Sequence, residues 1–191
     1  GFWHLAGNVY FLLVFGDNVE DALGRWRCAA LLGAAVLLGA VLHIAGDPRS
    51  NAPLVGASGG IAGVIVYYAL RYPHARVGVA LRFAVYFKYL SMPAYVGLIF
   101  WIVLQLVVAW EQLAGVTNVS ALGHLGGALA GFAARTIEVV AAARQQALAR
   151  PYAEALVRPE ASSPPEAPPR REAPPRPQRP LAGPPPPRPR R

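Results

Sequence analysis

The chain has 191 residues, of which 54% are hydrophobic, and its formal net charge is +8. Long apolar stretches fill the sequence up to about residue 140, and Pro and Arg crowd the remainder. This composition excludes a soluble globular protein, and it predicts a membrane domain over residues 1–140 and a disordered tail over residues 141–191.

Five apolar segments are candidates for membrane-spanning helices, because a bilayer core about 30 Å thick needs about 20 helical residues. They extend over residues 2–16, 27–45, 56–71, 93–111 and 120–137. The first begins directly after Gly1, with no initiator Met, which we interpret as a fragment that lacks its natural start. Residues 77–92 are also apolar, but Arg82 and Lys88 interrupt them, so we expect an interfacial segment and not a further span. The sequence thus predicts an all-α polytopic membrane protein.

The distribution of Lys and Arg among the predicted loops sets the expected orientation. The first loop holds Arg25 and Arg27, the second only Arg49, the third several basic residues, residues 111–120 none, and the tail many. Cytoplasmic loops carry the excess of basic residues, so the tail is expected in the cytoplasm. Because the tail and one loop hold most of the positive charge, we attribute it to the membrane-adjacent tail and not to nucleic-acid binding.

Four polar residues lie near the outer ends of the first, third and fifth predicted helices, namely His4, Asn8, Ser58 and His124. Polar groups are costly inside a membrane, so each one needs a partner, a water-filled cavity or a function. His4 and Asn8 are one helical turn apart and share a helix face. Alone, this pair is typical of hydrogen bonding between helices. Because the His4–Asn8 pair lies at the same predicted membrane depth as Ser58 and His124, we expect the four residues to share one site.

Ser58 lies in the segment PLVGASGGIAG, where Pro53 and the glycines predict an irregular loop that gives way to a helix near the serine. A helix start presents unpaired N–H groups and a partial positive charge, both suited to a developing oxyanion. An isolated serine before an apolar run is more typical of a helix N-cap. The surrounding glycines and His124 favour a nucleophile instead.

Strips of glycine follow both candidate residues. Gly59 and Gly63 follow the serine, Gly127 and Gly131 follow the histidine, and Gly56, just before the serine, is counted with these packing glycines. Small residues at this spacing let two helices approach closely, which a short serine side chain requires to reach an imidazole on a neighbouring helix. Helix packing alone explains the glycines but not the histidine.

Four motifs occur in order along residues 1–137: His4-xxx-Asn8, Glu20-xxx-Gly24, Gly56-Ala57-Ser58-Gly59 and His124-xx-Gly127-xxx-Gly131. In this combination they resemble the rhomboid family of intramembrane serine proteases. The resemblance implies a rhomboid-like helical bundle that lacks the family's first transmembrane helix, with the five predicted spans as its second to sixth helices. One departure is Ala62, which stands where some family members place an aromatic residue that stacks on the histidine.

The resemblance implies an intramembrane serine endopeptidase with a Ser–His dyad and with no acid, metal or cofactor. Ser58 would attack the scissile carbonyl, and His124 would take and return the proton. His4, Asn8 and the Ser58 amide would hold the oxyanion. The implied substrates are transmembrane helices of other proteins, cut near the outer membrane face, so the expected partners are membrane proteins and lipid and no nucleic acid. The composition points to a bacterial cell membrane.

Three alternatives stay open. A rhomboid-like pseudoprotease would bind or escort membrane proteins without cleaving them, although the presence of both Ser58 and His124 argues against it. The string GASGG also fits the G-x-S-x-G elbow of α/β hydrolases, which needs a preceding strand and an acid between serine and histidine. A transporter would line a polar path with intramembrane His and Asn, but the sequence has no paired repeat or midplane carboxylate.

Overall fold

The computed structural model describes residues 1–49, 56–83, 86–117 and 119–157. The chain divides into two compact units, Gly1–Ala147 and Leu148–Arg191, and the contacts that build the fold lie within the first. The loop expectation at Pro53 and the expectations for the Pro/Arg tail beyond residue 157 lie outside the described residues.

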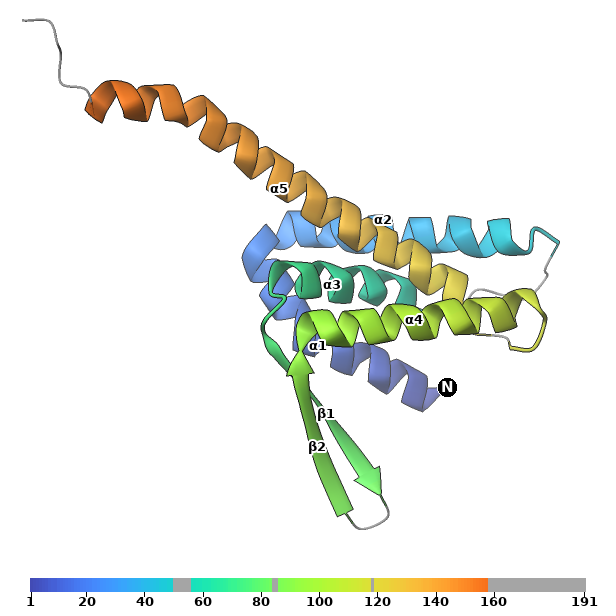
Figure 1. Ribbon diagram of the computed structural model, residues 1–191. Helices are drawn as coiled ribbons and strands as arrows, with labels where there is room; N and C mark the ends of the chain where they lie inside the picture. Colours follow the sequence, from blue (N-terminus) through green and yellow to red (C-terminus); the bar gives the residue numbers. More distant parts are fainter. Residues whose placement is uncertain (50–55, 84–85, 118, 158–191) are drawn as a thin grey trace, which may run out of the picture. The chain divides into compact units, whose positions relative to one another are not determined.

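Five helices and one hairpin make up the described part of the chain (Figure 1). In order they are α1 (Phe2–Leu23), α2 (Arg25–Gly46), α3 (Ser58–Arg71), β1 (Arg76–Phe83), β2 (Tyr86–Pro93), α4 (Ala94–Leu113) and α5 (Ala121–Val157). The five helices occur where the apolar segments predicted them. Two are longer than expected, because charged residues end an apolar span but do not end a helix. Asp17, Glu20 and Asp21 continue α1 to Leu23, and α5 continues to Val157, so residues 141–157, which were expected in the disordered tail, are helical.

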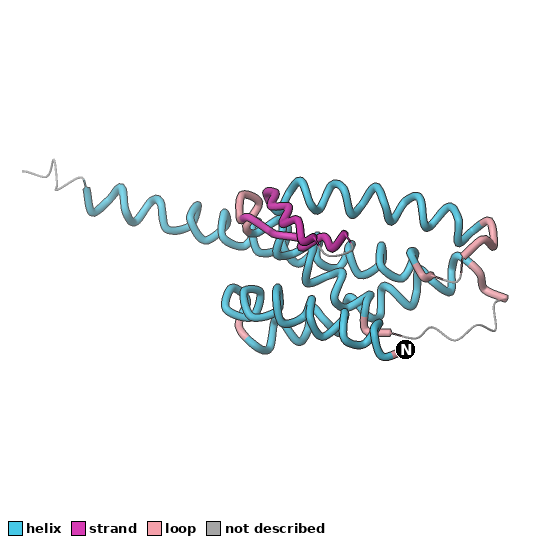
Figure 2. Tube along the Cα trace, turned by 90° about the horizontal axis from the view of Figure 1, so that it is seen from below, coloured by secondary structure: helices cyan, strands magenta, loops and turns pink. Residues whose placement is uncertain are grey.

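The segment expected at the membrane interface forms an antiparallel β-hairpin, shown in the strand colour of Figure 2. Its register pairs Arg76 with Pro93 at the open end and Phe83 with Tyr86 next to the turn. The segment is rich in β-branched and aromatic residues such as Val77 and Tyr89, which favour strands. The segment is not a further span, as the sequence indicated. It forms two paired strands, however, and not one amphipathic interfacial segment.

The central helix α3 is short and well covered. Its 14 residues extend about 21 Å, less than the thickness of a bilayer core. It packs against α1, α2 and α4, and most of its side chains are buried. Neighbouring helices therefore surround α3 in place of lipid. Among the described helices, three are long and apolar enough to cross a membrane: α2, α4 and the Ala121–Pro151 part of α5.

Glycines allow α3 and α5 to approach until their backbones touch. A Cβ atom added to Gly127 would collide with the carbonyl oxygen of Gly59, and one added to Gly131 would collide with that of Gly63. Across the other side of α5, a Cβ on Gly39 of α2 would lie 2.6 Å from the carbonyl oxygen of Gly123. The two glycine strips noted in the sequence thus face each other.

A tight turn joins α1 to α2. Gly24 has a φ of 78°, a left-handed conformation that favours glycine, and its N–H donates a hydrogen bond of 2.7 Å to the carbonyl of Glu20. The next helix starts at once with Arg25. The Glu20-xxx-Gly24 motif therefore corresponds to a helix–helix connection without a loop.

Candidate active site

Ser58 and His124 come together from two helices although 66 residues separate them in the chain. Ser58 is the first residue of α3, and His124 lies in the first turn of α5. The distance from Ser58 Oγ to His124 Nε2 is 2.9 Å, and both residues are half-buried. This is the geometry that proton transfer from a serine hydroxyl to an imidazole requires.

The chain before Ser58 has a conformation that only glycine adopts readily. Gly56 has a φ of 132°, and a Cβ atom at this position would lie 2.8 Å from Cε1 of His4. The lack of a side chain therefore lets the His4 ring lie directly against the backbone beside Ser58. No side chain among the described residues caps the start of α3, so the first N–H groups of this helix stay available to a ligand.

The start of α5 is held by a polar network that does not include the dyad. Ser120 Oγ accepts a hydrogen bond of 3.1 Å from the N–H of Gly123, as a helix N-cap does, and lies 2.8 Å from Nδ1 of His43 on α2. Gln112 of α4 accepts a hydrogen bond of 3.1 Å from the N–H of Leu122. Side chains of α2 and α4, together with Ser120, thus fix the turn of α5 that carries the candidate base.

A second polar contact of His124 was not predicted from the sequence. Its Nδ1 lies 2.9 Å from Oε1 of Gln105, a buried residue of α4. A signal for this residue was present, because Gln105 stands alone in the apolar string WIVLQLVVAW, and a polar group inside a span needs a partner. The same argument had selected His4 and Asn8.

The dyad lies in a cavity of about 750 Å³. His4, Asn8, Ser58 and His124 all line it, so the structure brings the four candidates from the sequence to one place. The rest of the lining is mainly apolar and comes from α1, α3, α4 and the hairpin. Among the residues described, no group of three His, Cys, Asp or Glu side chains is arranged to hold a metal ion.

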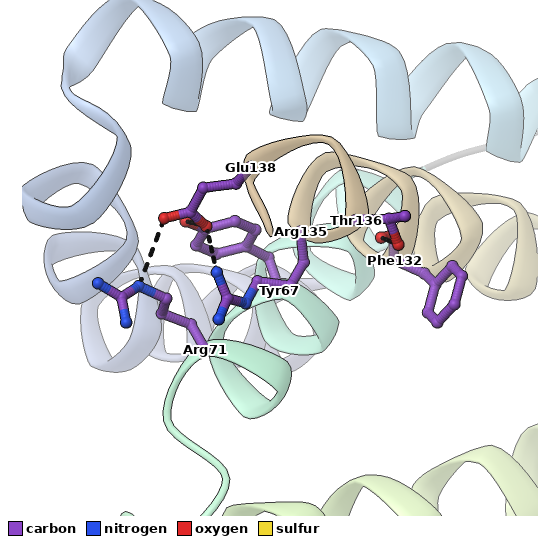
Figure 3. A network of polar contacts seen from close by, with 6 residues as sticks. All are labelled: Tyr67, Arg71, Phe132, Arg135, Thr136 and Glu138. Atoms are coloured by element: carbon purple, nitrogen blue, oxygen red, sulfur yellow. Dashed lines mark hydrogen bonds and ion pairs between the residues drawn. The ribbon is translucent and has the colours of Figure 1, made fainter. Parts of the chain in front are cut away.

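The opposite end of α3 carries a different polar cluster, shown in Figure 3. Glu138 of α5 accepts hydrogen bonds from the hydroxyl of Tyr67 at 2.7 Å and from Arg135 at 2.8 Å. Arg71, the last residue of α3, pairs with the same carboxylate at 3.6 Å. The cluster ties α3 to α5 far along both helices from the dyad, so the two helices are joined at both ends of their contact.

Comparison with known proteins places this arrangement in a family. Neither the curated proteins nor the solved structures contain a match to the chain. The family model of the rhomboid domain matches residues 1–140, which include every residue that lines the cavity. Together with the apolar helices, the match confirms the predicted all-α bundle of an integral membrane protein. The chain therefore belongs to the rhomboid family.

Proposed function

We propose that the protein is an intramembrane serine endopeptidase that cleaves transmembrane helices of other membrane proteins near the outer membrane face. The observation that carries this proposal is the 2.9 Å contact between Ser58 Oγ and His124 Nε2 at the wall of a large cavity. Membership of a family that generally consists of intramembrane proteases supports it. A Ser–His pair can activate a hydroxyl for acyl transfer without a third residue.

Both steps of the reaction, acylation and hydrolysis of the acyl-enzyme, use Ser58 and His124. His124 Nε2 accepts the hydroxyl proton while Ser58 Oγ forms a bond to the scissile carbonyl carbon, and the carbonyl oxygen becomes an oxyanion. His124 then gives this proton to the leaving amine as the C–N bond breaks. Water, deprotonated by His124, attacks the acyl-enzyme and releases Ser58 with its proton restored.

The oxyanion needs hydrogen-bond donors that are already in position. Three candidates are close to Ser58: the side chains of His4 and Asn8, which line the same cavity, and the N–H groups at the uncapped start of α3. The partial positive charge of a helix N-terminus adds to their effect. In this proposal His4, Asn8 and the Ser58 amide share the oxyanion.

The apolar part of the cavity suits a hydrophobic peptide segment. Side chains such as Val14, Ile65 and Trp101 contribute to this apolar lining. A helical substrate hides its carbonyls in internal hydrogen bonds, so a segment must unwind before Ser58 can attack it. Substrates with Gly or Pro near the cut are therefore favoured, because unwinding costs them least.

The dyad can be tested with the purified protein in liposomes and a reporter that has one transmembrane helix. Ser58→Ala and His124→Ala are each expected to reduce cleavage to background, since either change removes the activated hydroxyl. The matched control is His74→Ala, because His74 lies outside the cavity. Undiminished cleavage by Ser58→Ala would sink the assignment. Binding of the reporter without cleavage by the wild-type protein would establish the pseudoprotease alternative.

A further inference from the structure

Gln105 is buried at a position where an apolar side chain would cost less. Only 8% of its surface is exposed, and it is the one buried amide or charged side chain in the described part of the chain. On the same helix, Leu98 and Trp101 line the cavity, but Gln105 does not. It contacts His124 from outside the cavity, on the ring nitrogen that Ser58 does not use. A buried amide in a membrane protein is retained only with a partner, and here the partner is the base.

The contact selects the protonation state that the base needs. A neutral imidazole carries one N–H and one lone pair, and Nε2 must have the lone pair to accept the proton of Ser58. The proton then sits on Nδ1, and Oε1 of Gln105 at 2.9 Å is placed to accept it in a hydrogen bond. With the amide oxygen toward the ring, as the structure has it, the other tautomer would bring two lone pairs face to face at this distance. Gln105 thus favours the one form of His124 that can activate Ser58.

Among the described residues, two side chains form hydrogen bonds with the His124 ring, and no aromatic ring pairs with it. Ala62, one helical turn after Ser58, offers only a methyl group to the cavity. None of the aromatic ring pairs found among the described residues includes His124. The side-chain hydrogen bonds that the described residues make to this imidazole come from Ser58 and Gln105. Its orientation therefore depends on these two contacts.

We propose that Gln105 is the positioning residue of His124, so that α3, α4 and α5 supply a nucleophile, an orienting group and a base. This inference rests on the proposed protease function. After proton transfer, both ring nitrogens carry hydrogen, and the amide oxygen continues to accept from Nδ1. A neutral amide performs this role without placing a second charge in the membrane domain, whereas a carboxylate would have to be buried.

The kinetic test compares Gln105→Leu, which has no acceptor, with Gln105→Glu, which keeps an acceptor oxygen whether or not its carboxyl group is ionised. Gln105→Leu is expected to lower kcat about 10- to 100-fold, the effect of losing one buried hydrogen-bond partner, while KM changes little because Gln105 does not line the cavity. Gln105→Glu is expected to retain kcat within a few-fold. Equal losses in both variants would mean a packing role and overturn the inference, as would a wild-type kcat in Gln105→Leu.

Leu106→Ala is the matched control, because Leu106 is next to Gln105 on the same helix, is 57% exposed and does not line the cavity. It is expected to leave the kcat of the folded fraction unchanged. Normalising every rate to folded protein separates misfolding from loss of positioning.

A second measurement needs no substrate and therefore separates this inference from the proposed function. Nitrogen-15 NMR of the imidazole, assigned with His124→Gln, reports which ring nitrogen carries hydrogen. The wild-type protein is expected to show the proton on Nδ1, and Gln105→Leu is expected to shift it toward Nε2. An identical tautomer in both proteins overturns the role of Gln105. A shift without any cleavage by the wild-type protein overturns the protease function alone.

Discussion

Several positions around Ser58 have a small side chain or none, which leaves space or hydrogen-bond donors free at the site. Gly56 has no side chain, so the His4 ring can lie against the backbone next to the serine. Ala62 has only a methyl group, so the cavity stays open beside the imidazole. The first turn of α3 has no capping side chain, so its N–H groups keep their capacity to donate. The site thus depends on the lack of bulky and capping side chains as much as on its polar groups.

Asn8→Ala should slow turnover more than it weakens substrate binding. If its amide donates to the oxyanion chiefly in the transition state, kcat is expected to fall about 100-fold with a small change in KM. Steady-state kinetics on the reporter in liposomes measures both. Asn18→Ala is the matched control, because Asn18 lies on the same helix, is exposed and donates only to the carbonyl of Val14. An unchanged kcat in Asn8→Ala would remove this residue from the oxyanion site.

At the scale of helices, the position of the base relative to the nucleophile is set by how closely α3 and α5 pack. Two glycine pairs bring the backbones into contact near the dyad, and the Glu138 cluster joins the same helices farther on. Tyr67, whose side chain is fully buried, donates to Glu138, so even the core of α3 takes part in this connection. A short hydrogen bond between Ser58 and His124 is possible only with such close helices.

Gly127→Ala should loosen this packing. The new Cβ would overlap the carbonyl oxygen of Gly59, so the helices must separate, and overpacking of this kind typically costs about 1–3 kcal/mol. We expect a lower unfolding temperature in detergent and, because the dyad distance grows, a lower kcat. Gly33→Ala serves as control, since nothing lies within 4 Å of its added Cβ and alanine favours helix. Equal stability of the two variants would contradict close packing of α3 against α5.

At the scale of the molecule, the alternation of basic residues leads us to propose that the C-terminal part of the chain from residue 141 on is cytoplasmic, which includes the last turns of α5. The single cysteine, Cys28, is buried and can be changed to Ala to give a background without thiols. In that background, a membrane-impermeant thiol reagent is expected to label Val116→Cys in intact cells and Gln146→Cys only in inside-out vesicles. A C-terminal epitope should be digested by protease in the same vesicles, and its protection would contradict this orientation.

The sequence by itself determined the number of helices, the absence of a span in residues 77–92 and the candidate site residues His4, Asn8, Ser58 and His124. These follow from local properties, namely the length of apolar runs and the cost of a polar group within them. Helix ends were less predictable, because the acidic residues that close the first apolar run still continue α1. The hairpin was not predicted for a related reason, since the sequence of an apolar segment with two charges does not reveal whether it pairs with itself.

Only the tertiary structure decided which groups meet. His4, Asn8, Ser58 and His124 could be selected one by one, but their common cavity depends on the rotation and spacing of three helices. The contact between Gln105 and His124 depends in addition on the face that α4 turns toward α5. Such contacts join residues far apart in the chain, and no local pattern encodes the angle between two helices. The sequence therefore identified the candidate nucleophile and base, and the packing of the helices supplied the geometry through which they can act.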